Sequence, residues 1–306
     1  MNNQEIKERV LERVMAPYPK DCHIVPYSTP VVSFGNPETS TVATLGINPS
    51  SREFLDDGMN LLSGSEKRLV DTEVLGLSRE IESLSAEQAG EVIKGFFGYF
   101  EKKPYKWFSR LQKYVLDPAG ASFEPSAIDG VEGACHLDLV QWATDPVWGD
   151  IKDKGIQKTL LESDFEFLRF QLTNYEFKKL FLNGQEVVAQ FKRLGLAELI
   201  EVGRTSFQSH GKTSPLYRGK YGDTDVWGWG LNVAQPQVTL SNLEDLSKWI
   251  GDDSSVFTPR TLTVAKDKSS KSAESPGVPK VLCPVSFVKV VPDVVCDYCE
   301  EIHPKE

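Results

Sequence analysis

The sequence has few cysteines, no long apolar run and no excess of positive charge. Five cysteines in 306 residues are too few for a disulfide framework, so we expect reduced thiols or metal ligands. No apolar run is long enough for a signal peptide or a membrane span. The chain carries 34 basic and 44 acidic side chains, a formal net charge of −10. We therefore expect a cytoplasmic protein without membrane contact, and the composition disfavours a broadly basic protein that coats DNA.

Several standard catalytic and phosphate-binding motifs are also absent. Residues 211–213 read Gly-Lys-Thr like the end of a P-loop, but Ser206 stands where that loop needs a glycine. No Gly-x-Gly-x-x-Gly follows the first expected strand, and no Gly-x-Ser-x-Gly turn exposes a serine nucleophile. These absences argue against a P-loop nucleotidase, a dinucleotide-binding enzyme and a serine hydrolase.

Patterns typical of strands and helices alternate along most of the chain. Strands are expected at 41–45, 134–140, 178–182, 199–202 and 225–233, and helices at 86–102, 105–116, 160–177, 185–194 and 243–250. A loop is expected at 203–224. The alternation predicts an α/β fold, a three-layer α/β/α sandwich around a mostly parallel sheet. Ligands of such folds bind at the carboxyl ends of the strands, so the segments after Leu45, Leu139 and Val202 are the candidate site.

The composition changes once, near residue 251. Residues 1–250 are expected to form the main α/β domain, the Ser/Lys/Pro-rich residues 251–280 a linker or long loop, and residues 281–306 a small tail. The tail has a Cys-x12-Cys-x2-Cys-x3-His pattern that suits a structural zinc ion, with reduced free thiols as the alternative. The four candidate ligands are Cys283, Cys296, Cys299 and His303.

Three short motifs carry a resemblance to a known family. Residues 46–49, Gly-Ile-Asn-Pro, follow the first expected strand and resemble the first motif of the uracil-DNA glycosylase superfamily, closest to its mismatch-specific uracil/thymine branch. Residues 214–216, Ser-Pro-Leu, preceded by His210, resemble a stretched second motif. Asp138 ends the middle strand, where the family has an asparagine that reads the flipped base. The resemblance covers roughly residues 41–235 and implies a uracil-DNA glycosylase-like sandwich.

The resemblance implies a monofunctional DNA glycosylase, which extrudes a nucleotide and hydrolyses its N-glycosidic bond. Asn48 would orient a water towards the anomeric carbon, since an amide positions water without deprotonating it. His210 would donate to the leaving base or to a phosphate, unless it is merely an exposed loop histidine. No motif lysine is placed to form a Schiff base; Lys212 is the one residue that challenges this assignment.

Further base or DNA contacts are expected around these motifs. Residues 203–221 contain no acidic side chain, so this segment fits a phosphate-gripping loop. Trp142 and Phe54 are candidates for stacking on a flipped base, with core packing as the alternative for a tryptophan. The complete set of expected base- or DNA-binding residues is Gly46, Ile47, Pro49, Ser50, Phe54, Trp142, Lys212, Ser214, Pro215 and Arg218.

Asp138 departs from the family pattern in a way that bears on the substrate. An amide both donates to O4 and accepts from N3–H of uracil, whereas a carboxylate accepts from the exocyclic amine of cytosine. The sequence therefore favours cytosine or a modified cytosine, including one with a bulky phage-type 5-substituent, over uracil. Two alternatives stay open: a structural role for Asp138, capping a helix or pairing with His136, and a role as a water-activating base.

Two other functions remain compatible with the sequence. The same fold could serve as a non-catalytic nucleic-acid or nucleotide-binding module, because function resides in sites and not in folds. An enzyme acting on free nucleosides would need no loop that grips a DNA strand. We expect DNA as the partner of a monomer that needs no cofactor for catalysis, and leave open whether its role is repair or anti-phage defence.

Overall fold

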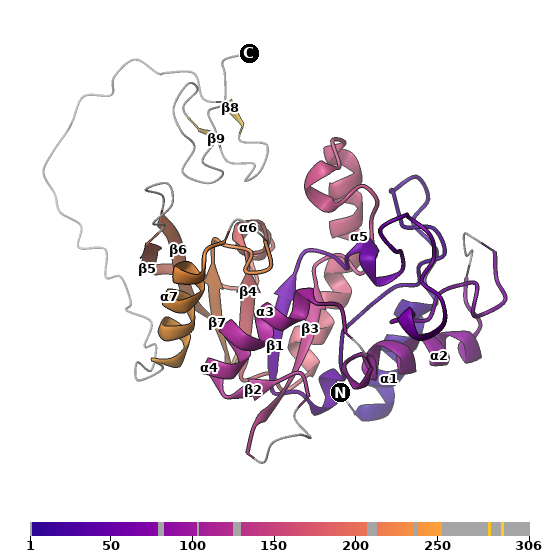
Figure 1. Ribbon diagram of the computed structural model, residues 1–306, viewed down its shortest axis with the longest axis horizontal. Helices are drawn as coiled ribbons and strands as arrows, with labels where there is room; N and C mark the ends of the chain where they lie inside the picture. Colours follow the sequence, from indigo (N-terminus) through magenta and orange to yellow (C-terminus); the bar gives the residue numbers. More distant parts are fainter. Residues whose placement is uncertain are drawn as a thin grey trace, which may run out of the picture.

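A single seven-stranded sheet organises the chain (Figure 1). The computed structural model describes residues 2–78, 83–102, 104–124, 130–206, 213–235, 238–252, 281–282 and 289–290. The strands are β1 (Val42–Gly46), β2 (Ala121–Ser122), β3 (Glu132–Asp138), β4 (Lys179–Asn183), β5 (Ile200–Ser206), β6 (Thr213–Tyr221) and β7 (Thr224–Trp229). Their order is β2-β3-β1-β4-β7-β6-β5, parallel from β2 to β7, while β6 runs antiparallel to both its neighbours. The predicted α/β sandwich with a mostly parallel sheet is confirmed.

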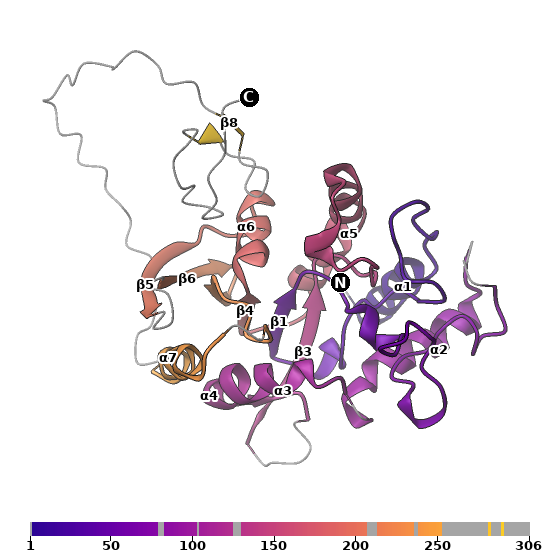
Figure 2. The ribbon, with the colours of Figure 1, turned by 45° about the horizontal axis from the view of Figure 1, so that its top comes forward.

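Helices cover both faces of this sheet (Figures 1 and 2). The helices α3, α4 and α7 lie on one face, and α5 and α6 on the other. Their bounds are α1 (Asn3–Val14), α2 (Ala86–Phe97), α3 (Trp107–Leu111), α4 (Asp117–Ala119), α5 (Lys154–Asn174), α6 (Gln185–Arg193) and α7 (Leu240–Gly251), with a π-helical turn η5 (Gln112–Leu116) between α3 and α4. Short 3-10 turns are η1 (Pro37–Thr39), η2 (Ser51–Glu53), η3 (Gly64–Glu66), η4 (Tyr99–Glu101) and η7 (Trp148–Asp150). No helix among the described residues combines the length and apolarity that crossing a bilayer requires.

The central strand β1 explains why the core forms here. All five of its residues are buried, as expected for a parallel strand with a helix layer on each face. It pairs with β3 on one side and β4 on the other. Both cysteines in the described part of the chain, Cys22 and Cys135, are buried free thiols in the hydrophobic core.

The expected loop at 203–224 is wrong, because most of it forms the hairpin β5–β6. Residues 213–221 form β6, of which residues 213–218 pair with β5 and residues 216–221 pair with β7. The sequence of this segment does not show the alternation typical of a strand, because polar and charged residues occupy some of its buried positions. One of them is Arg218, whose guanidinium carbon lies 3.3 Å from the centroid of the Trp227 ring. Helix α7 also starts earlier than the expected residue 243, because Thr239 and Asn242 form its capping box.

The two-residue strands β8 (Val281–Leu282) and β9 (Lys289–Val290) form a separate antiparallel pair. The rest of the expected linker and tail, including the four candidate zinc ligands, lies outside the described residues.

A buried ion pair attaches the N-terminal helix to the α/β body. Arg13 of α1 donates through Nη2 to Oδ1 of Asp164 in α5 at 2.6 Å, and Oδ2 of Asp164 accepts from the backbone N–H of Gln141 at 2.6 Å. Both charged side chains are at most 9% exposed. Removing one member of such a pair leaves the other charge buried without its partner.

Asp164→Asn should therefore lower the free energy of unfolding by about 3–5 kcal/mol, measured by urea denaturation. The control is Glu12→Gln in the exposed Arg9–Glu12 pair, which should cost less than about 1 kcal/mol. Equal effects of the two substitutions would contradict this role for Asp164.

Candidate active site

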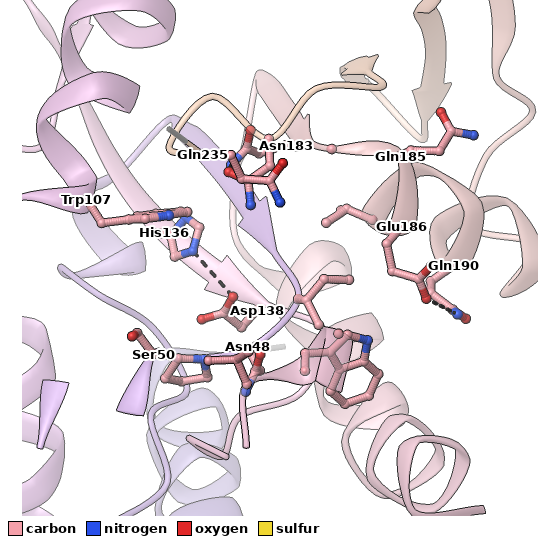
Figure 3. A pocket seen from close by; sticks show the side chains of 18 of the residues that line it. Asn48, Ser50, Trp107, His136, Asp138, Asn183, Gln185, Glu186, Gln190 and Gln235 are labelled. Atoms are coloured by element: carbon pink, nitrogen blue, oxygen red, sulfur yellow. Dashed lines mark hydrogen bonds and ion pairs between the residues drawn. The ribbon is translucent and has the colours of Figure 1, made fainter. Parts of the chain in front are cut away.

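A pocket opens at the carboxyl-terminal edge of the four central parallel strands (Figure 3). Its volume is about 730 Å³. Asp138 ends β3, Asn183 ends β4, and Asn48 and Gly230 follow β1 and β7; all four line the pocket. Parallel strands bring their carboxyl ends to the same edge, so residues far apart in the sequence meet there. This is the edge at which the strand pattern predicted ligand binding.

The floor of the pocket depends on a glycine that faces two polar side chains. Gly46 pairs in register with Asp138, and Thr44 with His136. Nδ1 of His136 is hydrogen-bonded to Thr44 Oγ1 at 2.7 Å, and its Nε2 lies 3.4 Å from Asp138 Oδ1. A Cβ at position 46 would lie 2.5 Å from Asp138 Oδ1 and 2.9 Å from His136 Nε2. Only glycine therefore leaves room for both groups where they stand.

The pairing of Asp138 with His136 was one of the structural alternatives from the sequence, and it is present. Both side chains are about 3% exposed and both line the pocket. Figure 3 shows His136 and Asp138 side by side at the pocket, with a dashed line between the imidazole and the carboxyl group. The pairing thus orients the carboxylate without withdrawing it from the cavity.

Asn48 is held by its amide nitrogen. Nδ2 donates to the carbonyl oxygen of Trp142 at 3.3 Å and to Thr144 Oγ1 at 3.0 Å. No described residue donates to Asn48 Oδ1. The side chain lines the pocket, so its oxygen remains to accept a hydrogen bond from a ligand or a water.

The segment around Asn48 is fixed to β3. The backbone N–H of Leu139 donates to the carbonyl of Gly46 at 3.1 Å, and that of Val140 donates to the carbonyl of Ile47 at 2.8 Å. Ile47, Pro49 and Ser50 line the pocket beside Asn48, as the motif predicted. The Ser50 hydroxyl accepts from the backbone N–H of Arg52 at 3.2 Å and so caps η2.

A second carboxyl group, Glu53 at the end of η2, lines the same pocket and is 3% exposed. Its Oε2 accepts from the Tyr99 hydroxyl at 2.6 Å, and Tyr99 Oη in turn accepts from the backbone N–H of Tyr105 at 2.9 Å. Burial, together with a smaller effect of the charge of Asp138, raises the pKa of Glu53 to about 8, although the Tyr99 hydrogen bond and the Arg68 charge lower it. Glu53 is therefore predominantly a neutral acid at pH 7.

Aromatic rings form one wall of the pocket, but not the rings expected from the sequence. Phe34, Tyr105, Trp107 and Phe108 line it, and the Trp107 ring lies edge-on to His136 with centroids 5.2 Å apart. Trp148 lines another part of the pocket.

The expected stacking roles of Trp142 and Phe54 are wrong. Each is 2% exposed, packs in the hydrophobic core and does not line the pocket. The Trp142 ring contacts Tyr18 edge-on, with Arg13 over its face, which confirms the core-packing alternative for this residue.

The opposite wall is rich in amides (Figure 3). Asn183 Nδ2 donates to Asn232 Oδ1 at 3.2 Å, and Gln190 Nε2 donates to Glu186 at 2.8 Å. Burial raises the pKa of Glu186 above its ordinary range. The polar residues of this wall are Lys154, Gln157, Lys158, Asn183, Gln185, Glu186, Gln190, Arg193, Asn232 and Gln235. They provide donors and acceptors for a polar ligand group at this side of the cavity.

The expected DNA-gripping residues on β6 are not placed for that role. Arg218 is 5% exposed and stacks on Trp227, so it does not reach a phosphate. Ser214 is buried, and its hydroxyl has no partner among the described residues. A Cβ at Gly230 would lie 2.8 Å from Ser214 Oγ and 3.0 Å from Pro215 Cδ, so both residues lie behind Gly230 and neither lines the pocket. The burial of Ser214 and Arg218 therefore contradicts their expected roles, the role of Pro215 stays a prediction, and His210 and Lys212 lie outside the described residues.

Sequence reasoning missed the roles of Glu53, Trp107 and Asn183 in lining the pocket. Glu53 stands five residues after Asn48 in a segment that reads as an ordinary polar turn, and nothing local indicates its burial. Asn183 carried a signal, since it directly follows the strand expected at 178–182, at the edge where ligands of such sheets bind. Within the described ranges, no three His, Cys, Asp or Glu side chains are arranged to hold a metal ion.

Gly46→Ala should lower the free energy of unfolding by about 1–3 kcal/mol, because the new Cβ forces Asp138 and His136 to move. Thermal and urea unfolding measure this. The control is Gly90→Ala in α2, where a Cβ meets nothing within 4 Å and the helix should gain about 0.5–1 kcal/mol. A Gly46→Ala protein as stable as the wild type would show that the floor is not sterically constrained.

Glu53 should make stability depend on pH. The folded protein retains a proton on Glu53 up to about pH 8, whereas the unfolded chain loses it near pH 4.5, so the stabilising contribution of protonation falls as the pH rises between these values. Relative to wild type, Glu53→Gln should therefore gain about 4 kcal/mol in unfolding free energy between pH 5 and pH 8, measured by urea denaturation.

Glu132→Gln is the matched control. The Lys178 hydrogen bond lowers the pKa of Glu132, so its contribution is lost only as the pH falls below the ordinary range of a glutamate. Its effect should stay constant from pH 5 to pH 8. A similarly constant effect of Glu53→Gln would refute the raised pKa.

No protein-family model matches this chain, and no curated protein matches it in sequence. Its function is therefore argued from the residues of the pocket themselves.

Proposed function

We propose that this protein is a monofunctional DNA glycosylase that accepts a flipped nucleotide in the pocket and hydrolyses its N-glycosidic bond. The observation that carries the proposal is that Asn48 and Asp138 line one cavity. The motifs predicted both residues as catalytic, although Asn48 follows β1 and Asp138 ends β3. The Gly-Ile-Asn-Pro segment begins at the last residue of β1 and continues into the loop after it, at the place that the resemblance to the uracil-DNA glycosylase superfamily implies. The chain is proposed as a member of that superfamily on these grounds.

Asn48 positions the attacking water. Its Nδ2 is engaged by Trp142 and Thr144, so Oδ1 accepts a hydrogen bond from a water and directs it towards the anomeric carbon. The water oxygen bonds to C1′ as the bond from C1′ to the base breaks, and the base departs with the proton that completes hydrolysis. Aromatic side chains at the pocket wall, Trp107 foremost, take the place of the neighbouring bases that the flipped base loses.

Asp138 reads the base. As a carboxylate it accepts from an exocyclic amine, which favours cytosine-type bases over uracil. The cavity volume of about 730 Å³ is within the range of roughly 300–1,000 Å³ typical of pockets for drug-sized ligands. That leaves room for a 5-substituent beside the pyrimidine, with the amide-rich wall available to a polar group.

The remaining expectations belong to the same proposal. The protein acts on DNA as a cytoplasmic monomer, catalysis needs no cofactor, and the biological role is repair or defence against modified phage DNA. Metal analysis of protein purified without chelator tests the tail zinc site.

The decisive experiment incubates the protein with oligonucleotides that contain uracil, a thymine mismatch, cytosine, or cytosines with small and bulky 5-substituents, and scores abasic sites by alkaline cleavage. We expect cytosine-type release. Asn48→Ala should slow it by roughly 100-fold or more. Asp138→Asn should shift preference towards uracil, because an amide both donates and accepts. The exposed Asp223→Asn is the matched control and should leave the rate unchanged.

Three results would contradict the proposal. Uracil release that survives Asp138→Ala, with no cytosine derivative touched, would overturn the substrate assignment. Binding of DNA without abasic sites would indicate a non-catalytic module, and hydrolysis of free nucleosides alone a nucleosidase. Borohydride trapping of a protein–DNA adduct would contradict a monofunctional mechanism and implicate a lysine, of which Lys154 and Lys158 line the pocket.

A further inference from the structure

The pocket contains two carboxyl groups with different hydrogen-bonding environments. Asp138 Oδ1 lies 3.4 Å from the imidazole Nε2 of His136. Glu53 accepts from the Tyr99 hydroxyl at Oε2, and no described residue is hydrogen-bonded to its Oε1. The Glu53 side chain is 3% exposed and lines the cavity. Its Oε1 is therefore a polar atom at the pocket without a protein partner.

The neutral acid is the form of Glu53 that the surrounding groups favour at pH 7. Burial is the largest cause of the raised pKa of Glu53, and the charge of Asp138 on β3 raises the pKa as well. The Tyr99 hydroxyl on η4 and the Arg68 cation lower it, and the resulting pKa is about 8. His136 faces Asp138 from the same strand. Because Tyr99 donates to Oε2, the proton of Glu53 resides on Oε1, the oxygen that is not engaged by the protein.

A neutral acid and a carboxylate that line the same pocket can offer one donor and one acceptor to a ligand. The amine edge of cytosine presents the complementary pair, an N3 acceptor beside the N4 donor. Uracil presents an N3–H donor beside the O4 acceptor, so in the same orientation its O4 would face the Asp138 carboxylate and its N3–H would face the acid proton of Glu53, and both contacts would be mismatched. The two carboxyl groups thus distinguish the bases more strongly than Asp138 alone.

We infer that Glu53 is a second base-reading and catalytic residue, which donates its carboxyl proton to N3 of a 4-aminopyrimidine whose N4 amine is held by Asp138. This inference rests on the proposed function and extends it to the leaving group. As the bond from C1′ to N1 breaks, its electron pair stays on N1 while the Glu53 proton passes to N3, so the base leaves neutral. The attacking water gives its oxygen and one hydrogen to C1′, and its second proton restores Glu53 through solvent.

The test combines binding of free bases with excision. Isothermal titration with free cytosine and free uracil at pH 6.5 and pH 9.0 should show preference for cytosine, with an affinity that falls about tenfold between these two pH values as Glu53 loses its proton. Glu53→Gln keeps a donor that does not titrate, so its cytosine affinity should stay level with pH. Its excision rate should fall at least about 100-fold, because the amide has no proton to give.

Two further variants separate this role from a structural one. Tyr99→Phe removes a hydrogen bond that lowers the pKa of Glu53, so the loss of cytosine affinity should move to higher pH. Glu101→Gln, an exposed carboxyl on the same turn η4, should change neither binding nor excision. Circular dichroism at both pH values verifies that each variant is folded.

The outcomes separate failure of this inference from failure of the proposed function. Excision with wild-type rate and pH dependence in folded Glu53→Gln would overturn the role of Glu53 and leave the glycosylase proposal standing. Cytosine binding that follows the expected pH dependence, without release of any base from DNA, would support base reading by Glu53, overturn its role in excision and contradict the glycosylase proposal. Equal affinity for cytosine and uracil at pH 6.5 would overturn the inference.

Discussion

The site depends on the parallel pairing of β1 with β3 at a position where one strand has no side chain. Gly46 stands opposite Asp138, and the space left by its missing Cβ is occupied by the carboxylate and by the His136 imidazole. His136 and Asp138 are two residues apart, so they project from the same face of β3. Asn48 follows two residues after Gly46. One backbone register thus sets the polar floor of the pocket and the amide beside it.

Two carboxyl groups in one cavity can act differently when their surroundings differ. Asp138 has an imidazole partner, whereas Glu53 is buried, and only the Tyr99 hydroxyl and the charge of Arg68 oppose the effect of this burial on its pKa. The pKa of about 8 follows mainly from burial. This arrangement provides an acceptor and an acid at neutral pH, the combination that a hydrolytic enzyme for cytosine-type bases needs at its leaving group.

The fold was largely predictable, whereas much of the pocket lining was not. β1, β3 and β4 carry apolar runs because they are buried on both faces, and the motif at Asn48 follows the first of them. β6 escaped prediction because its buried positions include Arg218, which a tryptophan ring contacts from another strand. Trp142 and Phe54 lie near the motifs in the sequence, which predicted that they would stack on a base, but both pack in the hydrophobic core. The acidity of Glu53 arises from tertiary burial, which no local pattern encodes.

The most direct measurement of the central claim is mass spectrometry of the small molecules released when the protein is incubated with DNA that contains modified cytosines. The account predicts the free base, with its substituent intact, and an abasic strand whose backbone is uncleaved. If folded wild-type protein released no base from DNA, or released a base only from free nucleosides, the result would contradict a DNA glycosylase that depends on Asn48 and Asp138.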